Sequence, residues 1–100
     1  MENCGLGVNA LEANTTGNHN TALGKQSLAL NTTAHNNTAV GCNALGSNTT
    51  GTSNTGIGCS SLQNNTTGSE NTAVGYYAML SNATGGYTVC LFYTSQRPRD

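Results

Sequence analysis

The sequence predicts an all-β fold, a parallel β-solenoid of the β-roll or β-helix kind with about five coils of 17 residues. The main observation is an internal repeat. One asparagine-led phrase recurs at a constant spacing of 17 residues, which is typical of solenoids whose coils stack on one another. Helical arrays need about 33 or more residues per repeat, so this period favours strands. The coils begin at Asn3, Asn20, Asn37, Asn54 and Asn71.

The first segment of each coil is predicted to be a strand. Counted from the opening asparagine as position 1, it reads NTAL, NTAV or NTGI in coils two to five, which is too short for a helix. Alternation puts positions 2 and 4 on one face and positions 1 and 3 on the other. Glycine at position 5 supplies the positive φ of a corner. These glycines are Gly7, Gly24, Gly41, Gly58 and Gly75.

The second segment of each coil surrounds positions 8 and 9, a small residue followed by Leu or Met. A single 3₁₀-like turn is an alternative there, but a second strand is favoured. We expect each coil to bury this large residue together with the aliphatic residue at position 4. Position 15, glycine in all coils but the second, is a second predicted corner. Asparagines at positions 1 and 12 and threonines at positions 2, 13 and 14 are expected to form ladders between coils.

The chain divides into a repeat domain, residues 1–87, and a degenerate sixth coil with a cap and tail, residues 88–100. Phe92 stands where a corner glycine is expected, and the charged residues Arg97, Arg99 and Asp100 follow. The first coil has no comparable cover. An exposed strand edge is a template for another strand, so we expect head-to-tail self-association. A piece cut from a longer array is the alternative.

The phrases NTALG, NTAVG and NTGIG, each followed by a small residue and Leu or Met, resemble the head repeats of trimeric autotransporter adhesins. They are also similar to the NTA-[VIL]-G-x-x-A-L-x-x-NTTG arrays of phage tail-fibre and surface proteins. The resemblance covers residues 3–87, with a longer period than the adhesin heads. It implies parallel β-rolls that trimerise and project from a cell or virion surface. One face of the strand would then fill the coil, and the other would meet a neighbouring subunit.

Composition excludes several classes of function. With three basic and four acidic residues, the chain has no positive field for nucleic acid. No apolar run approaches the roughly 18 residues of a membrane span. The acidic residues share no repeat position, and no Ser/His/Asp grouping or metal-ligand spacing occurs, so we expect no enzyme, no catalytic residue, no metal and no cofactor.

Three sets of residues are candidate sites. Asn-x-Thr acceptor sequences recur once per coil, and either a glycan or an amide that holds a corner explains them. Cys42 and Cys59 share position 6 in adjacent coils, where the spacing of about 4.8 Å permits a disulfide but parallel strands make its dihedral awkward. A row of threonines at position 14 offers a polar, ice-facing ladder. The acceptor asparagines are Asn14, Asn31, Asn48, Asn65 and Asn82; the threonines are Thr16, Thr33, Thr50, Thr67 and Thr84.

The sequence therefore predicts a structural or adhesive protein, part of an extracellular fibre or filament that self-associates as a homotrimer or head to tail. Its partners would be further copies of the chain, with glycans or a host surface as additional partners. Two alternatives are an ice-binding solenoid that uses its threonine rows, and a phage tail-fibre segment that binds a receptor.

Overall fold

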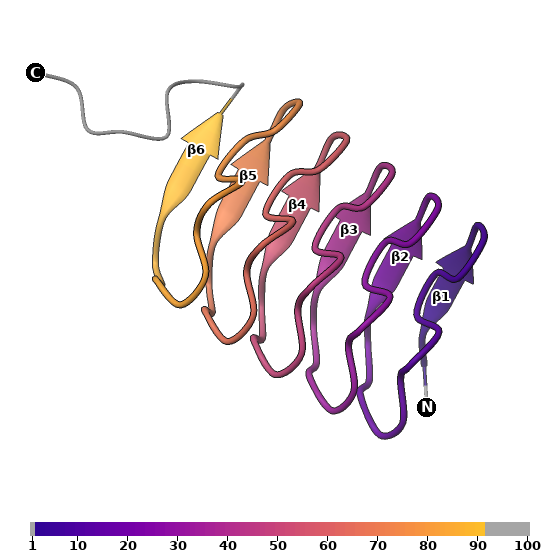
Figure 1. Cartoon of the computed structure of the whole chain (residues 1–100). Helices are drawn as coiled ribbons and strands as arrows, with labels where there is room; N and C mark the ends of the chain where they lie inside the picture. The colour runs from indigo at the N-terminus through magenta and orange to yellow at the C-terminus, as the bar shows by residue number, and fades with distance from the viewer. Residues whose placement is uncertain (1, 92–100) are drawn as a thin grey trace, which may run out of the picture.

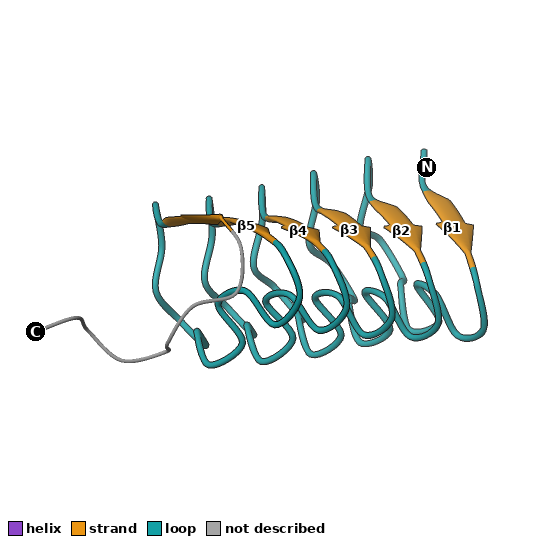
Figure 2. Cartoon of the chain, turned by 90° about the horizontal axis from the view of Figure 1, so that it is seen from above, coloured by secondary structure: helices purple, strands orange, loops and turns teal. Residues whose placement is uncertain are grey.

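The computed structural model describes residues 2–91 and is an all-β parallel solenoid, as predicted. Six strands of three residues each lie side by side in chain order, one per coil (Figure 1). They occupy one side of the stack, and turns and loops form the remainder (Figure 2). The strands are β1 (Cys4–Leu6), β2 (Thr21–Leu23), β3 (Thr38–Val40), β4 (Thr55–Ile57), β5 (Thr72–Val74) and β6 (Val89–Leu91).

Equivalent residues of adjacent coils are direct neighbours in the sheet. Thr21 pairs with Thr38, and Thr38 pairs with Thr55, so the register equals the sequence period of 17. The predicted corner at position 5 is confirmed, because Gly41 has a φ of 128°. A Cβ on Gly41 would lie 2.6 Å from the carbonyl carbon of Gly58 in the next coil. The glycine is therefore required both for its backbone angle and for the close approach of two coils.

The second corner has a different basis. Gly51, at position 15, does not have a positive φ, but a Cβ there would lie 2.2 Å from the carbonyl oxygen of Gly68 and 2.6 Å from Asn48 Oδ1. Close packing of one coil against the next, with an asparagine amide between them, selects glycine at this position. The left-handed residues of this corner lie two positions later, for example at Asn36 (φ 64°).

The prediction of a second strand is wrong: positions 6–11 form consecutive turns. In the second coil Gln26 and Leu28 have φ of 62° and 49°, in the left-handed region that non-glycine residues rarely adopt. The amide of Ser27 donates to Gly24 O within the coil, whereas the amides of Gln26 and Leu28 donate to carbonyls of the two neighbouring coils, Val8 O and Ala44 O. Successive amides of this segment thus donate alternately within the coil and to the neighbouring coils, so the same residues form the turns and hold the coils together.

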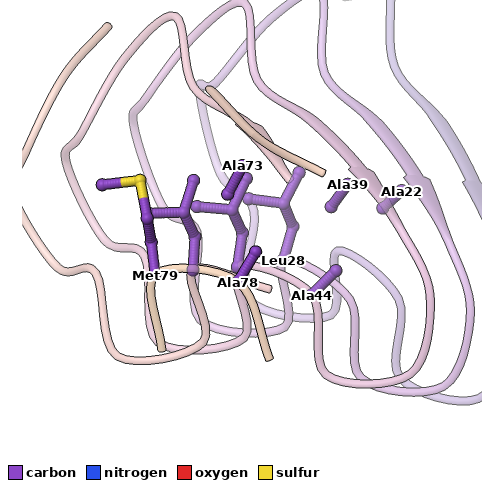
Figure 3. Packing of buried hydrophobic residues seen from close by; sticks show 9 residues of the cluster. Ala22, Leu28, Ala39, Ala44, Ala73, Ala78 and Met79 are labelled. Carbon is purple, nitrogen blue, oxygen red and sulfur yellow. The ribbon is translucent and has the colours of Figure 1, made fainter. Parts of the chain in front are cut away.

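The core is a narrow column inside the coils (Figure 3). Leu28, Leu45 and Leu62 are fully buried at position 9, with alanine or glycine at position 3 and alanine or serine at position 8 around them. The expectation that position 4 is also buried is wrong. Its side chains lie on the outer side of the strands, where inside the stack they are half-buried and Ile57 is 37% exposed. Each inner coil therefore buries one large apolar side chain, because small residues bring the two sides of the coil too close together for a second.

One irregularity in this column involves Ser61 and Gly56. Ser61 Oγ is buried and, among residues 2–91, has no hydrogen-bond partner. Its counterpart Ser27 donates to Gly24 O at 2.9 Å. A Cβ on Gly56 would lie 3.0 Å from Ser61 Oγ, and the other inner coils carry alanine at this position. The hydroxyl therefore turns toward the space that the missing methyl group leaves.

The sixth strand extends the sheet beyond the five full repeats. Val89 pairs with Thr72, and Leu91 pairs with Val74, in the same register as the other coils. The beginning of the predicted sixth coil thus behaves as a coil. The predicted cap and tail, with Phe92, Arg97, Arg99 and Asp100, lie outside the described residues.

Two glycine-to-alanine substitutions should change stability in opposite directions. Gly56→Ala restores the methyl group of the other coils and turns Ser61 Oγ toward Gly58 O, so we expect the free energy of unfolding to rise by about 0.4–1 kcal/mol. Gly41→Ala forces a left-handed angle and a backbone clash, so we expect a loss of at least about 1 kcal/mol. Urea unfolding followed by circular dichroism measures both. Equal shifts of the same sign contradict the packing described above.

Candidate functional site

The first buried polar ladder is formed by the asparagines at position 1. The amide N–H of Asn37 donates to Asn20 Oδ1 at 3.0 Å, and that of Asn54 donates to Asn37 Oδ1 at 2.9 Å. Asn37 Nδ2 also donates to Gly51 O at 2.9 Å, which closes its own coil. Each side chain therefore ties its coil shut and holds the start of the next. Buried amides are stable here because both their donors and their acceptors are used.

The second ladder consists of the predicted acceptor asparagines at position 12. Asn48 Nδ2 donates to Asn31 Oδ1 and to Gly51 O, both at 2.9 Å, and Asn65 Nδ2 donates to Asn48 Oδ1 at 2.9 Å. These three side chains are fully buried, and Asn14 and Asn82 at the ends are half-buried. The nitrogen that would carry a glycan is thus engaged inside the stack. Of the two explanations left open, this geometry is that of an amide that holds a corner.

The threonine rows differ in their environment. At position 13 the hydroxyls donate to the backbone of the next coil, as from Thr49 Oγ1 to Thr66 O at 3.3 Å. The candidate ice-facing row at position 14 is exposed on a bend and not on a strand. Its members are Thr16, Thr33, Thr50, Thr67 and Thr84.

An uncharged surface lies on the outer side of the strands, which we call the outer sheet face. It consists of the side chains at positions 2 and 4, which share one face as their alternation predicts. Between the ends these side chains are half-buried, apart from Ile57, which is 37% exposed. The first column is Cys4, Thr21, Thr38, Thr55, Thr72 and Val89, and the second is Leu6, Leu23, Val40, Ile57, Val74 and Leu91.

The two cysteines of the candidate disulfide, Cys42 and Cys59, are free thiols in this structure. Cys42 is exposed and Cys59 is half-buried, each in the turn that follows its strand. The Cys59 thiol lies 3.8 Å from Ser60 Oγ. The pair therefore occupies one side of the solenoid, in adjacent coils, as the repeat indicates.

Charged groups are scattered over the surface. His19 Nε2 lies 3.0 Å from Glu2 Oε1, and both side chains are exposed. Among residues 2–91 there is no group of three or more His, Cys, Asp or Glu side chains that could hold a metal ion. The same residues include no helix long and apolar enough to cross a membrane.

A polar groove is the surface that the sequence analysis missed. It follows the solenoid axis between the residues at position 7, such as Gln26 and Asn43, and those at positions 10 and 11. Position 10 changes from coil to coil, with small residues at Ala29 and Gly46. This variation was a visible signal, but its meaning depends on the turns that bring positions 7 and 10 together.

Comparison with protein-family models, with curated proteins and with solved structures found no match to this chain.

Asn48→Asp should destabilise the folded protein, because it disrupts the buried ladder of asparagines at position 12. The new oxygen would face Asn31 Oδ1 and Gly51 O, which are both acceptors, so we expect a loss of about 3–5 kcal/mol at pH 7. Burial beside acceptors raises the pKa of the new carboxyl in the folded state. The loss is therefore smallest below the unfolded pKa of about 3.9 and grows as pH rises through the folded pKa.

The matched control is Asn64→Asp, because Asn64 is exposed and adjacent in sequence to the ladder. We expect this variant to remain close to wild type. Chemical unfolding of the three proteins at pH 4 and pH 7 makes the comparison. Equal stability of the two variants at pH 7 argues against a buried amide ladder.

Proposed function

We propose that this chain is a structural or adhesive segment of an extracellular fibre, and that its solenoid lengthens by end-to-end association. The observation that carries the proposal is the exposure of apolar side chains at the two ends of the sheet. Leu6 and Val89 are each 70% exposed and Leu91 is 55% exposed, whereas Leu23, Val40 and Val74 inside the stack are half-buried. Another coil at either end would cover these side chains as neighbouring coils do inside.

Hydrogen bonding at the first strand supports the same assembly. Cys4 N donates to Asn20 O, and Leu6 O accepts from Gly24 N, so both residues direct peptide groups toward β2. Neighbouring residues of a strand direct theirs to opposite sides, so Gly5 N–H and C=O face the open edge. An edge of this kind recruits another strand. We propose that β1 of one copy pairs with β6 of the next.

The partners in this proposal are further copies of the chain. A homotrimer that associates through the outer sheet face is the competing arrangement, and the resemblance to adhesin heads favours it. The same resemblance supports the part of the proposal that places the chain at a cell or virion surface. End-to-end assembly has the additional support of unpaired backbone groups, which the outer sheet face does not offer.

Gly5→Pro tests end-to-end association. Proline removes the N–H at the open edge, where a proline is tolerated, so we expect the association constant to fall at least about tenfold. Gly5→Ala is the control. It keeps the N–H, its Cβ would lie 3.4 Å from the nearest atom, and alanine occupies the equivalent position in other coils. Sedimentation velocity over a wide range of concentrations measures the change.

Two results count against the proposal. One is a wild-type chain that remains monomeric at every concentration. The other is a closed trimer that persists equally in Gly5→Pro and Gly5→Ala, which indicates association through the outer sheet face.

Ice binding is a second candidate, and a specific observation favours it. Thr21, Thr38, Thr55 and Thr72 form a column on the outer sheet face, at a rung spacing of about 4.8 Å. Beside them runs a column of aliphatic side chains. This surface combines hydroxyls and methyl groups in a regular, uncharged array. It is a better candidate for ice than the exposed row at position 14, which lies on a bend.

Thr55→Tyr and Thr50→Tyr distinguish the two threonine rows. Tyrosine is a good strand former, so Thr55→Tyr should keep the fold while its ring interrupts the regular array. We expect thermal hysteresis to be lost in Thr55→Tyr and retained in Thr50→Tyr. Absence of thermal hysteresis in concentrated wild-type protein removes this candidate function. Loss of hysteresis in Thr50→Tyr and its retention in Thr55→Tyr would assign ice binding to the position 14 row instead.

A further inference from the structure

The groove on the side of the solenoid has a volume of about 290 Å³ and extends over the first four coils. Its origin lies in position 10. Glu12 and Gln63 occupy this position in coils one and four, whereas Ala29 and Gly46 occupy it in coils two and three. Two small residues between two long ones leave a hollow about two coils long. The volume is close to the lower end of the range for small-molecule sites, about 300 Å³.

The polar groups of the groove are available for a ligand. In the described part of the chain, Gln26, Asn43 and Gln63 form no side-chain hydrogen bond, although their amides carry both donors and acceptors. The asparagines of the two ladders, by contrast, use theirs within the stack. The left-handed turn residues at position 7, with φ of 62° at Gln26 and 63° at Asn43, set two of these amides one coil apart.

The chemistry of the lining selects an uncharged ligand rich in hydroxyl groups. Amides at Gln26, Asn43 and Gln63 and the hydroxyl of Ser47 can both donate to and accept from such groups. Among residues 2–91, no lysine or arginine lines the groove and Glu12 is its single carboxylate, which disfavours anions such as phosphate or sulfate. Leu30 is 52% exposed at the same groove and offers an apolar contact to the C–H face of a ring.

The spacing of the amides supports the same class. Rungs of the solenoid repeat about every 4.8 Å, which is comparable to the length of one hexose unit in a chain. An extended peptide advances about 3.3 Å per residue, so neither one residue nor two matches a rung. The backbone of these turns is in addition engaged between coils, as in Gln26 N to Val8 O at 2.8 Å, and is not available for strand addition.

We propose that this groove is a binding site for a short neutral oligosaccharide, with the amides at positions 7 and 10 bound to the hydroxyls of successive sugar units. The site lies within one chain, in the turns of its first four coils and not in the strands, and its hollow at Ala29 and Gly46 lies in coils two and three. The inference therefore goes beyond the proposed assembly, and binding can be measured separately from association.

The experiment is a titration of the ¹⁵N-labelled chain with cellotetraose, maltotetraose and chitotetraose, followed by amide chemical shifts. At least one of them should bind with a dissociation constant on the order of 1 mM, and the largest shifts should lie at Ala29, Gly46 and Ser47. A hyaluronan tetrasaccharide, which is anionic, should bind more weakly.

Ala29→Gln tests the site directly. It fills the hollow with the residue that coil four carries at the same position, Gln63, so the fold should be retained. We expect binding to weaken at least about tenfold. Thr67→Gln adds the same side chain at an exposed bend outside the groove and should bind as wild type does.

Three results overturn the inference. They are the absence of binding by all three neutral tetrasaccharides, shifts confined to the outer sheet face or to the ends, and equal binding by Ala29→Gln and Thr67→Gln. Tighter binding of the hyaluronan fragment overturns the assignment to a neutral ligand.

Discussion

Every part of this solenoid depends on one constraint: the asparagine amides that a coil buries are hydrogen-bonded to the coils on either side. Asn48 shows this most clearly, because its nitrogen donates to Asn31 and its oxygen accepts from Asn65, both at 2.9 Å. A coil in isolation would leave these groups unpaired in its interior, which is costly. Stacking therefore stabilises the polar interior as well as the apolar one. A change of one residue in the period would shift both amide ladders at once.

This constraint also explains how a core of small residues holds strained turns. Leu45 is fully buried, yet its φ of 52° lies in a region that costs about 1–2 kcal/mol for a residue with a Cβ. The same angle directs Leu45 N toward Ser61 O in the next coil at 3.0 Å. Burial of the side chain and the bond between coils together offset the strain. Leucine is thus selected here for its size, against its backbone preference.

The sequence was sufficient to predict the architecture, because the period of 17, the glycine at position 5 and the alternation at positions 1–4 each have a local physical meaning. It was insufficient for the second segment, since nothing local marks Leu28 as a left-handed turn residue. That conformation follows from contacts with the coils on either side. Alternation predicted that positions 2 and 4 share a face but not which face is outside, and the large aliphatic side chains at position 4 suggested a core position. The groove could not be predicted, because it depends on turns that were expected to be a strand.

The distribution of variation among the five coils separates the scaffold from its surfaces. Positions 1, 5 and 12, whose residues hold adjacent coils together, carry one residue type throughout. Position 10 carries a different residue in every coil: Glu12, Ala29, Gly46, Gln63 and Leu80. Identical coils could present only a uniform surface, since stacking repeats every side chain along the axis. A site of limited length therefore requires positions outside the ladders, where a change in one coil leaves the stacking intact. The groove arises at such a position. The ends of the sheet, by contrast, expose the same repeated positions that pair between coils inside the stack. The proposed assembly and the proposed ligand binding thus depend on different positions of one repeat.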